Sequence, residues 1–181
     1  MRWIKKIGLV CGGILIVLLI LYVLPWKSRI NTTINGAQCK IGESKYIEKV
    51  TITIKGDYKR YLFKKDTFSG RIELDNRDFT LADSKVSLEF HDNKSFLLYQ
   101  NVVGGNATQD PLGTIYCSSD FKKILICIYE EIGSATDYAN IKSYTWDAEN
   151  GLFFSAPALN REEAIRIAKD LAEESINGDF R

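Results

Sequence analysis

The sequence predicts an α+β protein: an N-terminal transmembrane helix, then an antiparallel β-meander domain with one C-terminal amphipathic helix packed on the sheet. Residues 7–26 carry no charged side chain. Residues 50–54 alternate with period two and are β-branched throughout, which is typical of a half-buried strand. Residues 164–172 place apolar side chains at helical spacing. These three observations predict an anchor and a single folded domain.

The uncharged run predicts a membrane span. At the helical rise, residues 7–26 extend roughly 30 Å, the thickness of a bilayer's hydrocarbon core. A cleaved signal peptide would have a shorter apolar region and a small-x-small cleavage site, and a lipoprotein signal would need a small residue before Cys11. A buried core helix would show a polar face. The sequence therefore favours an uncleaved signal anchor over these alternatives.

The flanking charges predict the orientation of this span. Three basic residues precede it and two closely follow it: Arg2, Lys5 and Lys6, then Lys27 and Arg29. The positive-inside rule then predicts a cytoplasmic tail at 1–6, a stalk at 27–45 with an edge strand around 37–41, and an extracytoplasmic domain at 46–181. The expected location is the cell membrane, in single-pass topology.

Two partners follow from the predicted span. The lipid bilayer is the first. Gly8 and Gly12 fit the small-x-x-x-small pattern and are candidate contacts for the helix of a membrane-protein partner. The alternative interpretation is that both glycines are tolerated in a lipid-facing helix.

The charge balance argues against a nucleic-acid partner. The chain has 24 Lys and Arg residues against 23 Asp and Glu residues, and three of the basic residues precede the span. The domain is therefore slightly acidic, with both signs mixed along the chain. A nucleic-acid surface would need a basic patch or stripe, so the sequence predicts no nucleic-acid partner.

Three cysteines lie in the predicted domain: Cys39, Cys117 and Cys127. Cys117 and Cys127 are a candidate disulfide, because they lie on the two arms of one predicted hairpin at matching parity. The alternative, that they are small buried hydrophobes, is favoured because a domain of this size needs no covalent staple. There is no Cys-x-x-Cys spacing and His91 is the only histidine, so we expect no metal site and no cofactor.

Short strands and one final helix make up the predicted domain. Asn150-Gly151 is the clearest hairpin signal. Asn160 and Glu163 form a capping-box pattern, with Leu159 before them as a hydrophobic staple. These features predict a meander of antiparallel strands and a helix that starts after Asn160.

No catalytic constellation stands out. His91 lies in a predicted turn, its neighbour Asp92 is expected to point to the opposite face, and no nucleophile elbow is present. The glycine-rich loop predicted at 102–113 lacks a phosphate-binding motif, and we expect either a mobile loop or a contact surface there. The sequence therefore predicts a protein that is not an enzyme.

Four segments carry a resemblance: the anchor, 67–74, 113–121 and 156–164. Through them the chain resembles small uncharacterised single-pass membrane proteins of Gram-positive bacteria. The resemblance implies a bacterial cell-envelope setting. It implies no activity, cofactor or site residue.

These observations together predict a membrane-anchored, extracytoplasmic, non-catalytic binding or accessory module of unknown ligand. Two alternatives stay open. One is a cell-envelope hydrolase whose active-site residues are dispersed along the chain. The other is an immunity protein that shields its own cell from a secreted toxin.

Overall fold

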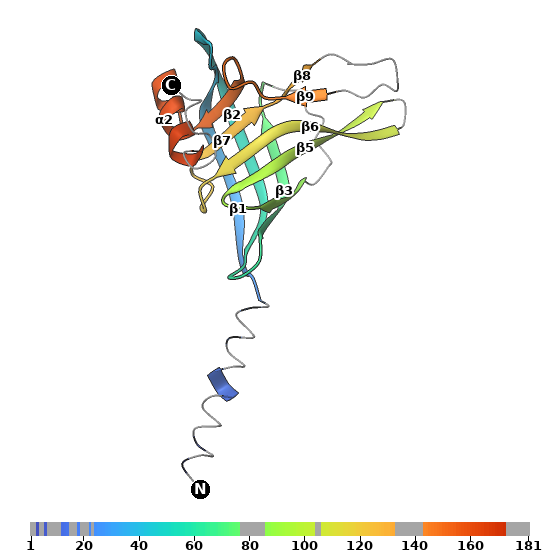
Figure 1. Cartoon of the computed structure of the whole chain (residues 1–181), viewed down its shortest axis with the longest axis vertical. Helices are drawn as coiled ribbons and strands as arrows, with labels where there is room; N and C mark the ends of the chain where they lie inside the picture. The colour runs from blue at the N-terminus through green and yellow to red at the C-terminus, as the bar shows by residue number, and fades with distance from the viewer. Residues whose placement is uncertain are drawn as a thin grey trace.

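The computed structural model describes residues 24–76, 86–103, 106–132 and 143–172, together with residues 3, 6, 12–14, 18 and 22; side chains are described for all of these except 99–110 and 132. Most of the described chain is antiparallel strand, folded into one large sheet with a single helix on its outer face (Figure 1).

Eight strands form the sheet, in the order β4-β3-β2-β1-β10-β7-β6-β5. Two short strands, β8 and β9, pair separately. The bounds are β1 (Trp26–Lys40), β2 (Glu43–Arg60), β3 (Asp66–Leu74), β4 (Val86–Phe90), β5 (Lys94–Val103), β6 (Asn106–Cys117), β7 (Ile124–Ile128), β8 (Glu130–Ile132), β9 (Ser143–Thr145) and β10 (Leu152–Ala156).

The sheet curls until its two edge strands meet. β4 and β5 are the two ends of the strand order, yet they follow one another in the chain and are joined by a bridge between His91 and Lys94. The inner face therefore encloses a core of aliphatic and aromatic side chains. Its fully buried members include Ile52, Ile54, Phe68, Leu88, Leu97, Ile115, Ile124, Ile126 and Phe154.

Aromatic side chains fill one end of the enclosed core. The ring of Phe121, from the β6–β7 turn, lies 5.1 Å from the ring of Tyr58 and 5.9 Å from that of Phe90, both in edge-on geometry. Phe68 lies 5.5 Å from the same ring. Phe121 is buried, so this end of the sheet is packed with side chains.

Helix α2 (Arg161–Ala172) covers part of the outer face, over β1, β10, β7 and β6. Its N-terminus forms a variant of the capping box that the sequence predicts. The Glu163 amide donates to Asn160 Oδ1 at 2.9 Å, and Glu163 Oε2 accepts at 2.8 Å from the amide of Leu159, one residue before the N-cap. Ala164 and Ala168 are fully buried against the strands. Because their side chains are small, the helix can lie close to the sheet.

The predicted α+β fold class with an N-terminal transmembrane helix is wrong. The described residues are mostly antiparallel strand, and none of their helices is long and apolar enough to cross a membrane. Most of residues 7–23 lie outside the described part of the chain. The final residue of the predicted span, Trp26, begins β1. The predicted single-pass topology, cell-membrane location, cytoplasmic tail and extracytoplasmic placement depended on that helix and are corrected with it.

The segment predicted as a stalk, 27–45, forms most of β1 and the start of β2. Its outward side chains, such as Arg29 and Asn31, are exposed, and their polarity resembles that of a linker. On the other face of the same strand, Ile30 and Ile34 point inward and pack against the core. The folded unit therefore begins at Trp26, well before residue 46.

Candidate functional site

The candidate site is the outer edge of β5. Along its length β5 pairs with β6, but towards β4 the described residues form only the bridge between His91 and Lys94. If that ladder continued, Val86 at the start of β4 would lie opposite Tyr99. β5 thus extends past β4 only from Gln100 onward. Phe96 and Leu98 precede that overhang, where a continued ladder would place Glu89 and Ser87 of β4. From Phe96 to Val103 the strand nevertheless has no ladder partner on this side among the described residues.

The hydrogen bonds at the β4–β5 turn show which way the backbone of β5 points. The Lys94 amide donates to the His91 carbonyl at 3.0 Å, and the His91 amide donates to the Lys94 carbonyl at 2.9 Å. Successive residues of a strand direct their N–H and C=O groups to alternate sides. Phe96 therefore points its N–H and C=O to the side of β5 away from β6, where no ladder partner is described, while Ser95 and Leu97 point theirs towards β6.

The side chains of this edge alternate in the same regular way. Ser95 and Leu97 are buried on the inner face, whereas Phe96 is 70% exposed and Leu98 is 43% exposed on the outer face. An edge strand with apolar outer side chains is a template for pairing with another extended chain, and proteins usually protect such edges with charges or with very short strands. The β5 edge has neither protection at Phe96 and Leu98.

A bulge separates two halves of the β5–β6 hairpin. The register shifts between Leu97 and Leu98, so that Leu97 pairs with Gly113 and Leu98 with Pro111. Bulges bend a strand and increase its twist. Beyond the bulge β7 no longer pairs with β6, and the distal part is a two-stranded ribbon that extends away from the sheet (Figure 1).

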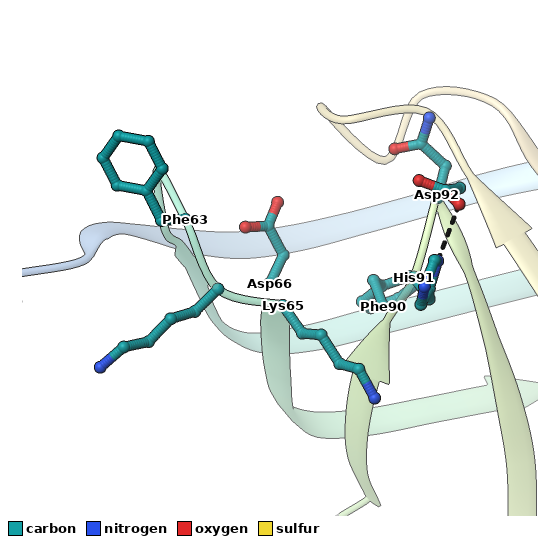
Figure 2. Close-up of a pocket in the computed structure, with 8 residues that line it drawn as sticks. Phe63, Lys65, Asp66, Phe90, His91 and Asp92 are labelled. Carbon is teal, nitrogen blue, oxygen red and sulfur yellow. Dashed lines mark hydrogen bonds and ion pairs between the residues drawn. The ribbon is translucent and has the colours of Figure 1, made fainter. Parts of the chain in front are cut away.

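A second surface feature is an open pocket of about 620 Å³ between two turns. Figure 2 shows Phe63, Lys65 and Asp66 from the β2–β3 connection on one side, and Phe90, His91 and Asp92 from the β4–β5 turn on the other. Its lining is Phe63, Lys64, Lys65, Asp66, Phe90, His91, Asp92 and Asn93.

His91 and Asp92 form a close pair in this pocket, with 2.7 Å between His91 Nδ1 and Asp92 Oδ2. The expectation that they point to opposite faces is wrong, because Asp92 has a left-handed backbone with φ of 49° and is no longer part of a regular strand. Both side chains are well exposed. The pocket lining contains no hydroxyl or thiol nucleophile, so the pair has nothing to activate for covalent hydrolysis.

Asp66 is engaged in structural contacts. The Tyr58 hydroxyl donates to Asp66 Oδ2 at 2.6 Å and the Tyr61 amide donates to Asp66 Oδ1 at 2.8 Å. Burial, together with the neighbouring Asp66 carboxylate, raises the pKa of Tyr58 to about 12. Asp66 therefore fixes the β2–β3 connection, and its carboxylate is committed to that role.

The candidate disulfide between Cys117 and Cys127 does not form. Cys117 and Cys127 are free buried thiols, as is Cys39. In the β6–β7 register Cys117 pairs with Ile124 and Cys127 pairs with Thr114, which places the two cysteines on opposite faces of the sheet. Cys117 packs in the inner core and Cys127 under α2. The preferred alternative, small buried hydrophobes, is confirmed.

The other predicted sites fall outside the candidate site. Gly8 lies outside the described residues, and nothing lies within 4 Å of the position that a Cβ on Gly12 would occupy. Within the described part of the chain, no group of three or more His, Cys, Asp or Glu side chains could hold a metal ion. Much of the loop predicted at 102–113 is strand β6.

Sequence reasoning missed the β5 edge. The alternation over 95–98 correctly indicates a strand, and it also shows two apolar residues, Phe96 and Leu98, on one face and Ser95 and Leu97 on the other. That pattern contains apolar side chains on both faces, which is also typical of a strand buried on both sides. Only the strand order shows that this strand is an edge.

Comparison with known proteins adds no relative. No family model matches the chain, and neither the curated proteins nor the solved structures searched contain a significant match. The functional argument therefore depends on the chain's own geometry.

Proposed function

We propose that the protein is a non-catalytic polypeptide-binding module that adds an extended segment of a partner protein to the edge of β5. The observation that carries this proposal is the β5 edge itself, with outward-pointing backbone groups at Phe96 and exposed apolar side chains at Phe96 and Leu98. Main-chain hydrogen bonds give affinity in strand addition, and pockets or side chains at alternate positions give specificity.

The partner is a single extended strand rather than a second copy of the folded sheet. β4 lies beside the beginning of β5. β4 would therefore obstruct a whole second sheet at the start of the β5 edge, whereas a single strand needs less space. Every second side chain of the bound segment would lie beside Phe96 and Leu98 on the outer face. We therefore expect apolar residues at alternate positions in that segment. Such a segment would also give the distal β5–β6 ribbon a third strand, and two-stranded ribbons alone are only marginally stable.

The hydrolase alternative loses support from the pocket, because the pocket lining offers the His91–Asp92 pair no hydroxyl or thiol side chain to activate. The immunity alternative is a special case of the proposed function when the toxin is a polypeptide. In that case the β5 edge would bind an extended segment of the toxin.

The test is selection of binders from a random peptide library with the purified full chain, followed by affinity measurement with synthetic peptides. We expect selected peptides with apolar residues at alternate positions. Phe96→Ala should weaken them about tenfold, because it removes a large apolar contact. Phe96→Pro should weaken them roughly fivefold further, because it also removes the outward N–H while leaving the ladder to β6 intact.

Phe63→Ala is the matched control, since Phe63 is an equally exposed phenylalanine in the turn pocket. It should leave peptide affinity unchanged. A peptide methylated at alternate backbone nitrogens should lose binding in one register and keep it in the other. The proposal is wrong if no peptide is selected, if Phe96→Pro binds as well as Phe96→Ala, or if sedimentation shows a dimer of the chain that only Phe96→Pro dissociates.

A further inference from the structure

A second surface, independent of the β5 edge, is the outward face of β1 and β2 near their paired ends. Here Lys27 lies directly opposite Lys59, Arg29 opposite Asp57, and Asn31 opposite Lys55. Lys27, Arg29 and Lys55 are exposed and Lys59 is half-buried. We call Lys27, Arg29, Lys55 and Lys59 the basic face.

The cations of the basic face are not neutralised within the described structure. Among the described residues, no carboxylate oxygen lies within 4.0 Å of their side-chain nitrogens, although Asp57 stands in the same row as Arg29. Like charges directly opposite one another across strands are destabilising. An anion between Lys27 and Lys59 would relieve that cost.

The arrangement of the cations is linear. Residues two apart on a strand recur about every 6.6 Å, and neighbouring strands lie about 4.8 Å apart. The basic face is therefore a track about 13 Å long. Lys27 and Lys59 lie at one end, Arg29 lies in the middle opposite the acidic Asp57, and Lys55 lies at the other end opposite Asn31. Helix α2 packs on β1 much farther along, at Ala37 and Cys39, and leaves this track open.

The chemistry of the surrounding side chains selects the kind of polyanion. The neighbours of the cations in the same rows of the sheet include Asn31, Thr33, Thr53, Asp57, Thr67 and Ser69, and none of these is aromatic. Proteins that bind single-stranded nucleic acid combine basic grooves with aromatic side chains on which bases stack. We propose that the basic face binds a linear polymer of phosphate groups that carries no bases, with successive phosphates along the track.

The experiment measures binding of linear polyphosphate to the full chain, and thermal unfolding with and without it. We expect binding that weakens steeply with salt, and a higher melting temperature in the presence of polyphosphate. The Lys27→Gln/Lys59→Gln double variant should bind at least about tenfold more weakly. Without ligand, its melting temperature should equal or exceed that of the wild type, because the like-charge pair is gone.

The Arg166→Gln/Lys169→Gln double variant is the matched control, because it removes the same number of positive charges from exposed positions on α2. It should bind polyphosphate as the wild type does. The proposal is overturned if polyphosphate fails to bind at low salt, or if this control weakens binding as much as the Lys27→Gln/Lys59→Gln variant. It is also overturned if inorganic phosphate alone gives the same stabilisation, or if single-stranded DNA binds more tightly at equal phosphate concentration.

Discussion

The two edge strands of the sheet, β4 and β5, are similar on the inside and different on the outside. On the inner face both contribute buried leucines, Leu88 from β4 and Leu97 from β5. On the outer face β4 presents Ser87 and Glu89, whereas β5 presents Phe96 and Leu98. Both strands therefore contribute buried side chains to the core, and they differ in the side chains that they expose on the outer face.

β4 has the usual protections of an edge strand. It is five residues long, and Glu89 on its outer face lies 3.6 Å from the ammonium of Lys65. Shortness and charge discourage pairing with other chains. β5 is twice as long and carries apolar outer side chains at its start. One edge strand of this sheet is therefore protected against pairing by its length and charge, and the other has neither protection.

The largest expected effects come from the inner faces, where the two edges should behave alike. Leu88→Ala and Leu97→Ala should each lower the free energy of unfolding by about 2–5 kcal/mol, because each leaves a cavity beside other buried side chains. Urea unfolding of both variants measures this. If Leu97→Ala lowers the free energy of unfolding by less than half as much as Leu88→Ala does, the two strands do not contribute equally to the core.

A smaller effect is expected from Tyr58→Phe, which acts on the β4 side alone. The substitution removes the hydroxyl that donates to Asp66, and Asp66 starts β3 opposite Phe90 of β4. We expect a loss of about 1–2 kcal/mol at neutral pH, since the half-buried carboxylate keeps one donor fewer. Amide exchange should rise in β3 and β4 and stay unchanged in β5 and β6. An equal rise in β5 would contradict the assignment of this contact to one edge.

The same tyrosine predicts the alkaline behaviour of the fold. The pKa of Tyr58 is about 12 in the folded chain, above the ordinary value of about 10. The neutral phenol is favoured by folding, so its contribution is complete below pH of about 10 and is lost as the pH rises towards 12. Burial raises the pKa of Tyr116 to about 12 as well. Tyr58→Phe should therefore show a shallower alkaline loss of stability than the wild type, without abolishing it.

The smallest changes in stability, within about 0.5 kcal/mol, are expected from exchanging the outer faces. Phe96→Glu gives β5 a charge like that of β4, and Glu89→Phe gives β4 an aromatic like that of β5. Light scattering at increasing protein concentration should show less self-association for Phe96→Glu and more for Glu89→Phe. If Glu89→Phe stays fully dispersed, strand length rather than outer chemistry protects β4.

Local sequence patterns predicted individual segments well and their assembly poorly. The alternation over 50–54 lies within β2, and the capping box at Asn160 and Glu163 begins α2. Both signals depend on residues close together in the chain. The polar residues of β1 resemble a stalk because the strands with which β1 pairs its inner face lie elsewhere in the chain. The length and lack of charge of residues 7–26 likewise predict a span without any information on the fold.

Local patterns could not predict the face of each cysteine, the basic face or the β5 edge, for the same reason. The parity of Cys117 and Cys127 depends on a register that their spacing does not determine. The basic face joins Lys27 with Lys59, which lie on different strands and are mixed with acids along the chain. Whether β5 is an edge depends on the order of all eight strands. Each of these properties comes from pairing between distant segments.

The pairing of β1 with β10 also has a consequence for synthesis. Ala37 to Lys40 of β1 pair with Ser155 to Leu152 of β10, near the other end of the chain. A ribosome that adds about 5–20 residues per second completes β1 to β4 several seconds before β10 emerges. During that interval the nascent half-sheet exposes the β1 backbone that β10 will later cover. Until β10 is made, this part of β1 is an unpaired edge that can pair with other strands.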